Sequence, residues 1–540
     1  MIHISTSFAL LVVAIIILVC IAGSRLSGRL GVPTLFIFIM LGMLFGSDGI
    51  FKIPFGNFAL AEQVCSVALI FIMFYGGFGT RWSEAKPVAG RSILLSSVGV
   101  VLTALLTGLF CHLVLNMALM EGMLLGAVLG STDAASVFSI LRSRKLNLKY
   151  GTASMLELES GSNDPFAYMM TVILLSAMTG SVSGGSAVLL LIRQLAFGLL
   201  TGATVAWLVT WLLKRYAFYG EGFDTIFVFA AAIISYALAS QIGGNGYLSV
   251  YLTGIILGNQ ELKNQKALVG FFDAFTGMMQ MLLFFLLGLL AFPSQMPSIV
   301  LPAIAIALFL TFVARPAAVG LLLAPSKPPI GQYLVISWAG LRGAASIVFA
   351  IMATLSEGYM KYDIFHIVFC VVLFSIIFQG SLLPKVAEKC DMIDNSTDVM
   401  RTFSDYTGDM QIQFVQLPIG DNHPWKNRKI CEIEMLPGML ITVIRRGAQT
   451  IVPKGQTVIQ EGDTVVLGAE GFTDSQGILL KEILMTPDHR WCGKKIAEAR
   501  FYKNTIIVMI KRGSQIIIPD GGTQTVSYTH LRAHETRHDL

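Results

Sequence analysis

The first 385 residues alternate long apolar runs with short polar loops. About 20 apolar residues in a helix are enough to cross the hydrocarbon core of a bilayer. The pattern predicts thirteen membrane spans, near residues 5–24, 31–47, 62–79, 93–117, 121–141, 154–179, 187–213, 223–241, 246–260, 270–292, 298–324, 330–355 and 362–384. The first run lacks a basic start and a cleavage site, so we interpret it as a retained helix.

After about residue 400 the pattern changes to short alternating segments punctuated by Gly and Pro, which is typical of strands and turns. A repeat with an offset of 66 residues lies in this region. HPWKNRKI (423–430) resembles HRWCGKKI (489–496), and VIRRGAQTIVPKGQT (443–457) resembles MIKRGSQIIIPDGGT (509–523). We therefore expect two copies of one small unit.

These changes predict the domain organisation of a mainly α membrane protein with a small cytoplasmic α/β region. Its parts are a membrane domain over 1–390, a linker over 391–402, a first unit over 403–485, a truncated second repeat over 486–526 and a final segment over 527–540. The final segment loses the repeat pattern and is interpreted as a non-native tail. Its His530, His534 and His538 are therefore not proposed as a metal site.

Composition and charge agree with a polytopic membrane protein. The chain is 54% hydrophobic and 13% charged, whereas soluble domains carry about 25% charged residues. The loops on one side of the predicted spans hold 14 Lys and Arg residues, and those on the other side hold only Lys52 and Lys361. Because positive loops stay inside, we expect an external N-terminus and a cytoplasmic C-terminal region. Seven Cys without a CxxC pair indicate neither a disulfide framework nor a zinc site.

An internal repeat also lies within the spans. GSTDAASV (130–137) resembles GLRGAASI (340–347), and the two lie on the fifth and twelfth spans, which cross in opposite directions. Inverted repeats whose broken helices meet near the midplane are typical of secondary transporters. The repeat predicts two broken helices, interrupted near Gly130 and Gly340.

Ionisable side chains inside spans cost about 2.5–3.5 kcal/mol each and are candidates for function. The candidates here are Asp133, Glu157, Glu159, Asp164, Arg193, Arg315 and Arg342. Arg193 has no acidic neighbour in the sequence, and Glu157 lies near the cytoplasmic end of its span, where we interpret it as a boundary residue.

The stretch LELESGSNDPFAY (156–168) combines several of these groups. Glu157, Ser160 and Asp164 share one helix face, which offers the oxygen ligands that hard cations prefer. Pro165 has no N–H, so we expect it to break the helix and free the Gly161 carbonyl as a further ligand. We hypothesise that Asp164 exchanges a proton for a cation, because a bound cation displaces the proton from a nearby carboxylate. The alternative is that Glu159 and Asp164 only neutralise Arg315 and Arg342.

At these residues the chain resembles the monovalent cation–proton antiporter family of the NhaP and NHE type. The matching motifs are ESGSND (159–164), the pair Thr132-Asp133, ARPAAV (314–319) and GLRGA (340–344), and the resemblance covers about residues 1–390. It implies a cation site formed by Asp164, Ser160, Thr132 and Asp133, with Asn163 bracing the broken helix and Glu159 paired with Arg315. The Asn163-Asp164 pair implies one-for-one, electroneutral exchange.

One position departs from the family pattern. Relatives often carry a Glu on the third span that pairs with the arginine of the GLRGA motif, and this chain has Tyr75 there. The partner of Arg342 is therefore open between the Tyr75 hydroxyl, Asp133 and a helix C-terminus.

The cytoplasmic region resembles the TrkA-C (RCK-C) module of potassium transport proteins, best over 403–485. Antiporters joined to this module form the potassium–proton subgroup linked to cell-volume regulation. The resemblance implies a homodimer and a small regulatory ligand, and a passive dimerisation tail is an equal alternative.

Together these observations predict a transporter of the bacterial inner membrane, not an enzyme. It is expected to exchange cytoplasmic K⁺ or Na⁺ for H⁺ in pH homeostasis and to contact membrane lipid. We expect no cofactor, no metal beyond the transported cation and no nucleic acid. A regulated potassium channel is the main alternative, but the chain has no filter like TVGYG. An intramembrane aspartyl protease would need a GxGD motif, which is missing. The choice between K⁺ and Na⁺ stays open.

Overall fold

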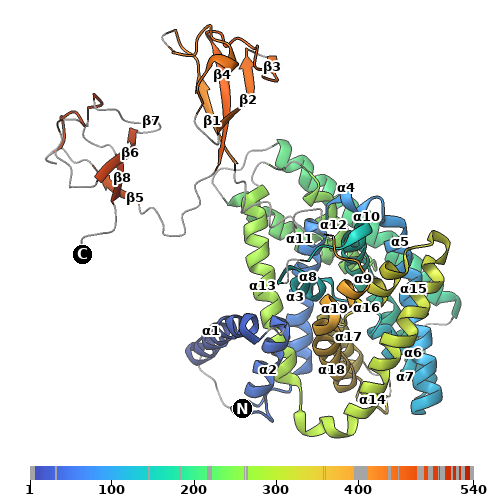
Figure 1. Cartoon of the computed structure of the whole chain (residues 1–540). Helices are drawn as coiled ribbons and strands as arrows, with labels where there is room; N and C mark the ends of the chain where they lie inside the picture. Colours follow the sequence, from blue (N-terminus) through green and yellow to red (C-terminus); the bar gives the residue numbers. More distant parts are fainter. Residues whose placement is uncertain are drawn as a thin grey trace. The chain divides into compact units, whose positions relative to one another are not determined.

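The chain divides into two compact units, Met1–Gly408 and Asp409–Leu540 (Figure 1). The computed structural model describes residues 6–30, 33–143, 146–181, 184–215, 222–260, 262, 265–356, 358, 360–394, 412–421, 423–435, 439–447, 449–470 and shorter segments between 480 and 535.

The described helices of the first unit follow the predicted spans closely. They are α1 (Thr6–Leu30), α2 (Thr34–Phe45), α3 (Phe58–Gly79), α4 (Trp82–Ala85), α5 (Ala89–Leu94), α6 (Val100–Leu115), α7 (Leu119–Val128), α8 (Ala134–Ser143), α9 (Thr152–Met178), α10 (Gly184–Arg215), α11 (Phe223–Gln241), α12 (Gly246–Gly258), α13 (Gln265–Leu290), α14 (Met296–Phe309), α15 (Arg315–Leu323), α16 (Ile330–Trp338), α17 (Ala344–Leu355), α18 (Ile364–Phe374) and α19 (Gly380–Lys389). Within the described residues, seven helical stretches are long and apolar enough to cross a membrane, and shorter apolar helices accompany them. The prediction of a polytopic helical membrane protein is confirmed.

Two of the predicted spans are interrupted, as the internal repeat indicated. The fifth span consists of α7 and α8 with non-helical residues 129–133 between them, and the twelfth consists of α16 and α17 with non-helical residues 339–343. These breaks contain Gly130 and Gly340. The prediction that Pro165 breaks its helix is wrong, because α9 continues through Pro165 from Thr152 to Met178.

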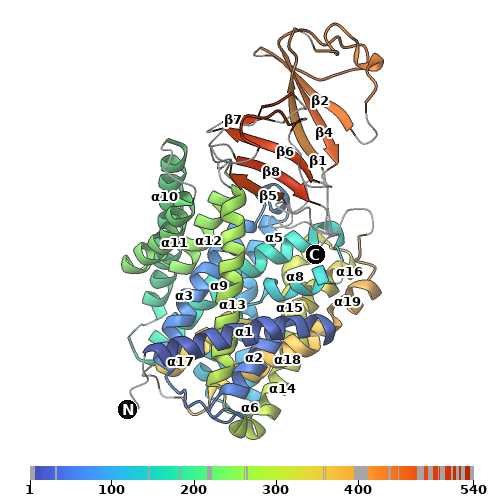
Figure 2. The same cartoon turned by 90° about the vertical axis from the view of Figure 1, so that its left-hand side faces the viewer.

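Close helix crossings hold the cavity-bearing helices together. Helix α13 packs along α2 and α3, and α12 also packs along α3 (Figure 2). At the crossing of α2 and α13, a Cβ on Gly42 would lie 2.1 Å from the carbonyl oxygen of Phe285. A Cβ on Gly288 would lie 2.2 Å from the carbonyl oxygen of Ile39. Small residues at such crossings let backbones approach, which is how membrane helices gain packing energy.

The second unit contains two four-stranded antiparallel sheets. The strands are β1 (Ile412–Pro418), β2 (Met439–Arg446), β3 (Gln449–Ile451), β4 (Asp463–Glu470), β5 (Leu480–Leu484), β6 (Thr505–Arg512), β7 (Gln515–Ile517) and β8 (His530–Glu535). The orders β1-β4-β2-β3 and β5-β8-β6-β7 are the same arrangement repeated. In the first sheet Ile441, Ile444 and Val465 form the centre of a small buried core.

The sheet pairing corrects the predicted boundary between the repeats. Strand β5 lies before residue 485 but pairs with β8 of the second sheet, so the boundary falls between residues 470 and 480. Strand β8 also lies within the segment that we interpreted as a non-native tail. Of the three histidines in that segment, His538 lies outside the described residues.

Candidate functional site

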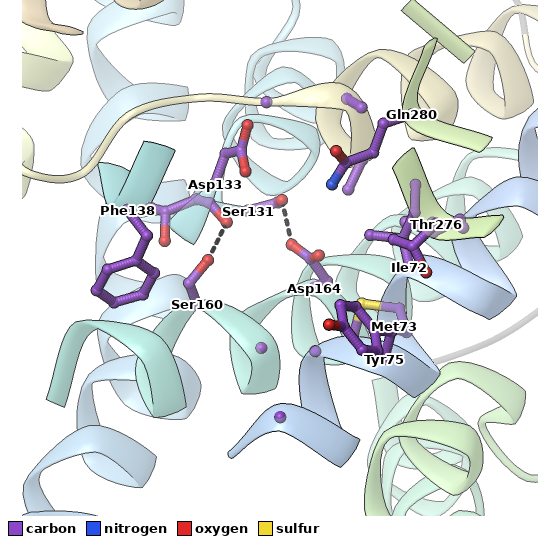
Figure 3. Close-up of a pocket in the computed structure, with 18 of the residues that line it drawn as sticks. Ile72, Met73, Tyr75, Ser131, Asp133, Phe138, Ser160, Asp164, Thr276 and Gln280 are labelled. Atoms are coloured by element: carbon purple, nitrogen blue, oxygen red, sulfur yellow. Dashed lines mark hydrogen bonds between the residues drawn. The ribbon is translucent and has the colours of Figure 1, made fainter. Parts of the chain in front are cut away.

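A cavity of about 450 Å³ lies among α3, α9, α12, α13 and the two helix breaks. Its polar lining residues are Tyr75, Ser131, Thr132, Asp133, Glu157, Ser160, Asp164, Tyr251, Asp273, Thr276 and Gln280. The structure thus places four predicted site residues, Asp133, Thr132, Ser160 and Asp164, in the lining of one cavity. Figure 3 shows three of them, Asp133, Ser160 and Asp164. Asn163, Glu159, Arg315 and Arg342 are outside the set of described residues that line it.

The two helix breaks cross each other at the edge of this cavity. The backbone N–H of Asp133 donates to the carbonyl of Leu341 over 2.8 Å. Gly343 lies directly against Asp133, because a Cβ on Gly343 would approach the Asp133 Cβ to 2.4 Å. The absence of a side chain at Gly343 therefore allows the two extended segments to meet.

Charged side chains at the crossing complement the helix ends. Asp133 lies just before α8 and accepts hydrogen bonds from the backbone N–H and the hydroxyl of Ser136, at 3.2 and 2.5 Å. An acidic N-cap satisfies free N–H groups and matches the positive end of the helix dipole. Asp133 consequently serves as a cap for α8 as well as a wall of the cavity.

The Arg342 side chain lies at the C-terminal end of a helix, α7. Its guanidinium donates to the carbonyl of Leu129, directly after α7, and to that of Ser131 over 3.0 Å. Its backbone N–H donates to the hydroxyl of Ser375 over 3.0 Å. Of the three partners left open above, Arg342 therefore uses the helix C-terminus. The cation balances the negative end of the α7 dipole.

The wall formed by α9 holds the first break in place. The Asn163 amide donates to the Thr132 hydroxyl over 2.5 Å and accepts from the Thr132 backbone N–H over 3.2 Å. The Ser160 hydroxyl donates to the Thr132 carbonyl over 2.5 Å, and the Ser131 hydroxyl donates to the Asp164 carboxylate (Figure 3). Asp164 thus faces the cavity with an oxygen-rich neighbourhood.

Glu159 and Arg315 form a buried ion pair behind this wall. The Arg315 Nη1 lies 2.6 Å from the Glu159 Oε1, and the two side chains are only 6% and 1% exposed. Gly340 borders Arg315, since a Cβ there would lie 3.0 Å from its Nε. Breaking such a buried pair costs roughly 3–5 kcal/mol, because the remaining charge is buried without compensation. A π-helical turn, Leu310–Ala314, directly precedes Arg315.

Pro165 and Arg193 each take part in a hydrogen bond that connects two helices. The Pro165 carbonyl accepts a hydrogen bond from the Asn245 amide over 2.9 Å, which ties α9 to the start of α12. The Arg193 guanidinium donates to the carbonyl of Ile242, directly after α11, over 3.3 Å.

Helix α13 supplies a wall that the sequence reasoning missed. Asp273, Thr276 and Gln280 follow i, i+3, i+7 and all line the cavity. The Tyr75 hydroxyl donates to Asp273 Oδ1 over 3.0 Å, which joins α3 to α13 at the cavity. The Gln280 amide points toward the hydrogen bond between Ser131 and Asp164 (Figure 3). The same one-face pattern that singled out α9 was present in the sequence of α13 and would have identified it.

The chemistry of the lining suits a hard cation. Carboxylate, hydroxyl and amide oxygens converge on the cavity, and these are ligands for hard cations. Among the residues that the structure describes, no group of three or more His, Cys, Asp and Glu could hold a metal ion.

The comparison with protein families agrees with this architecture. The family model described as sodium/hydrogen exchanger, transmembrane, matches residues 14–389, and the TrkA-C domain model matches residues 414–470 and 480–524. The second segment of the TrkA-C match begins at residue 480, where β5 begins. It therefore agrees with the boundary between residues 470 and 480 that the sheet pairing indicates.

Two similar proteins and one similar structure illustrate the relationship. The K(+)/H(+) antiporter NhaP of Alkalimonas amylolytica is 36% identical over 382 residues, which span 71% of this chain and 66% of that protein. The K(+)/H(+) antiporter NhaP2 of Shewanella sp. (strain MR-4) is 33% identical over 470 residues, which span 85% of this chain and 81% of that protein. The structure of the sodium proton antiporter MjNhaP1 from Methanocaldococcus jannaschii covers 71% of this chain and 99% of its own, with a TM-score of 0.63 and 23% identity, and shares the fold.

The family match spans most of the chain, and its membrane part has the two crossing helix breaks and the oxygen-lined cavity described above. The chain belongs to the sodium/hydrogen exchanger family of membrane transporters, with TrkA-C domains in its C-terminal unit.

Proposed function

We propose that the protein exchanges cytoplasmic K⁺ or Na⁺ for H⁺ across a bacterial inner membrane, with Asp164 as the group that binds either the cation or the proton. The observation that carries this proposal is the position of Asp164 on the cavity wall, next to Ser131, Ser160 and the Thr132 carbonyl. The names of the relatives favour K⁺, and the cavity chemistry accepts both ions.

Competition for one carboxylate is sufficient for exchange. A cation near Asp164 favours its charged form and displaces the proton, whereas a proton removes the charge that binds the cation. If the carrier changes its facing only with one of the two ligands bound, each cation moved outward is matched by a proton moved inward. Asp133 already serves as a helix cap, so one titrating carboxylate supports electroneutral, one-for-one exchange.

The side chains of the cavity support an opening toward the cytoplasm. Gly79 ends α3, Glu157 lies in the second turn of α9, and Asp273 lies in the third turn of α13. These helix ends adjoin the loops that carry most of the Lys and Arg residues. The N-terminus would then be outside and the TrkA-C unit cytoplasmic.

The polar face of α13 forms the second wall of the proposed cation path. Asp273 lies toward the Lys- and Arg-rich loop, and Thr276 and Gln280 lead from it toward Asp164 along one helix face. The Thr276 hydroxyl is buried and has no hydrogen-bond partner among the described residues, so it is available as a ligand. Asp273 would attract cations into the cavity, and Tyr75 would fix its orientation.

The proposal extends to the setting of the protein. Such exchange would serve pH homeostasis and cell-volume regulation, in a homodimer surrounded by lipid, with the TrkA-C unit as a ligand-binding regulator. A potassium channel would conduct without coupled proton movement.

Everted membrane vesicles with an imposed pH gradient test the site. Addition of K⁺ or Na⁺ should dissipate the gradient with the unaltered protein, and Asp164→Asn should abolish this response because an amide cannot hold the proton. Asp224→Asn makes the same chemical change at the start of α11, outside the cavity lining, and should keep the response. Dissipation by Asp164→Asn equal to that of the unaltered protein would refute the assignment.

A further inference from the structure

Residues 392–394, the last described residues before the TrkA-C unit, are hydrogen-bonded to the loop that joins α8 and α9. Leu148 and Ile393 form an isolated antiparallel β-bridge. The N–H of Lys149 donates to the Met392 carbonyl, and the N–H of Asp394 donates to the Asn147 carbonyl, each over 2.9 Å. We call this contact the linker bridge. It lies entirely within the first unit, and its residues 392–394 belong to the segment 391–402 that the sequence predicted to be a linker.

The turn that leads into the linker bridge is well determined by its own hydrogen bonds. Helix α19 ends in a Schellman motif, in which the N–H of Met392 donates to the Ala387 carbonyl and that of Asp391 to the Glu388 carbonyl, both over 3.0 Å. Asp391 takes the left-handed conformation with φ 52°. Met392 and Ala387 are both buried, which is the apolar contact that accompanies this motif.

Side chains of the linker bridge pack into the core beneath the site. Leu148 and Met392 are 4% and 1% exposed and belong to one cluster with Val335 of α16 and Leu156 of α9. Gly331, the second residue of α16, lies under the bridge, since a Cβ there would be 2.4 Å from the Cys390 carbonyl oxygen. The exposed ion pair between Lys149 and Asp391 adds little, because Asp391 is 95% exposed.

This position connects the linker to both helix breaks. The loop at 146–149 links α8, which Asp133 caps, to α9, which carries Asp164. Helix α16 leads into the second break, where Arg342 lies. A displacement of the chain at residue 394 would therefore shift both the α8–α9 loop, which follows the first break, and α16, which precedes the second break.

The linker bridge has the strength of a contact that can open and close. Two backbone hydrogen bonds and the burial of one Met side chain hold the bridge, and each contributes modestly to stability. A contact of this size lies within reach of a binding event on the TrkA-C unit, because coupling between two sites typically changes an affinity about 5- to 150-fold.

We propose that the linker bridge is the contact through which the TrkA-C unit controls transport, by shifting the α8–α9 loop and the start of α16. The proposal rests on the proposed exchange function. In this proposal residues 390–394 transmit a change in the TrkA-C unit to the membrane domain, whereas a passive dimerisation tail would transmit none.

A matched pair of variants isolates the bridge. Asp394→Pro removes the N–H that bonds the Asn147 carbonyl, and Ile393 in the bridge is already extended, as a residue before proline must be. Asp394→Ala keeps the N–H and removes only the carboxylate. If Asp394→Pro does not accumulate in membranes, the pair Lys149→Pro and Lys149→Ala tests the bond from the Lys149 N–H to the Met392 carbonyl. A proline is compatible at position 149, because the preceding residue Leu148 has the extended angles φ −111° and ψ 134°.

The experiment combines these variants with a disturbance in the TrkA-C unit of the full chain. Asp463→Asn removes the negative charge that pairs with Arg446 in the first sheet. In the Asp394→Ala background it should change hydrogen–deuterium exchange of the 146–156 segment, and the half-saturating K⁺ concentration, by about fivefold. In the Asp394→Pro background neither quantity should change further.

The contrary results are distinct. Equal effects of Asp463→Asn in both backgrounds, or no effect in either, would overturn the proposal. Hydrogen–deuterium exchange reports on the bridge whether or not the vesicles transport. A coupled bridge in a protein that moves neither K⁺ nor Na⁺ would refute the proposed function, and it would show only that the bridge links the TrkA-C unit to the α8–α9 loop.

Discussion

Each charged side chain at the crossing of the two breaks has its own partner. Asp133 caps α8, Arg342 binds carbonyls that follow α7, and Arg315 pairs with Glu159. These three positions are held by helix ends or by an opposite charge. Asp164 differs, because it accepts a hydrogen bond from the neutral Ser131 hydroxyl and its carboxylate faces the cavity. We therefore propose Asp164 as the group that exchanges its ligand.

The Tyr75–Asp273 pair gives a prediction at the residue scale. Asp273→Asn should raise the half-saturating cation concentration about fivefold with little change in maximal rate, because it removes roughly 1 kcal/mol of attraction in a water-filled approach. Tyr75→Phe keeps the carboxylate and should have a smaller effect in the same direction. Cation titrations of exchange in everted vesicles measure both quantities. A lower maximal rate at unchanged half-saturation would contradict a recruiting role for Asp273.

At the scale of elements, the breaks in α7–α8 and α16–α17 were predictable because their signal is local. Gly, Ser and Thr around Asp133, and the repeated Gly-x-x-Gly/Asp-Ala-Ala-Ser pattern, mark non-helical backbone in an apolar run. Pro165 misled because a proline removes only one helical hydrogen bond, and the rest of α9 stays packed against its neighbours. The partner of Arg342 and the placement of β5 depend on contacts between distant segments, which no local pattern contains.

Gly343 and Gly340, which both lie in the second break, should respond differently to substitution. Gly343→Ala would place its Cβ 2.4 Å from the Cβ of Asp133, which cannot rotate away. Overpacking costs about 1–3 kcal/mol, so we expect exchange to fall by about tenfold or more.

Gly340→Ala is the matched control for that substitution. Its Cβ would meet the Arg315 Nε at 3.0 Å, and a long side chain can shift. Exchange rates normalised to protein level should therefore rank the unaltered protein first, Gly340→Ala second and Gly343→Ala last. The reverse order of the two variants would show that the approach of Gly343 to Asp133 is unimportant.

At the scale of the whole molecule, the first TrkA-C sheet has its own acid-sensitive contact. Arg446 donates to both carboxylate oxygens of the buried Asp463 over 2.8 Å, and Gln460 donates its backbone N–H over 2.8 Å. The hydrogen bond from Arg446, followed by that from Gln460, lowers the pKa of Asp463 below its ordinary value. The pair therefore stabilises the sheet fully above pH about 4, and this stabilisation is lost as the pH falls through the lowered pKa.

Asp463→Asn should weaken the first sheet at neutral pH by roughly 2 kcal/mol and remove this part of its acid dependence. Hydrogen–deuterium exchange of β4 between neutral and acidic pH measures the effect in the full chain. Asp421→Asn is the control, because the Asp421 side chain is 78% exposed beside Lys426 and should change little. An acid dependence of β4 that is the same in Asp463→Asn and the unaltered protein would contradict the assignment.

The central claim is that a cation and a proton compete for Asp164, and the pH dependence of the half-saturating cation concentration tests it most directly. Competition at one carboxylate predicts that, at low pH, the half-saturating concentration of K⁺ or Na⁺ rises about tenfold for each unit of pH lowered, while saturating cation restores the rate. A half-saturating concentration that stays constant over the same pH range would contradict the account.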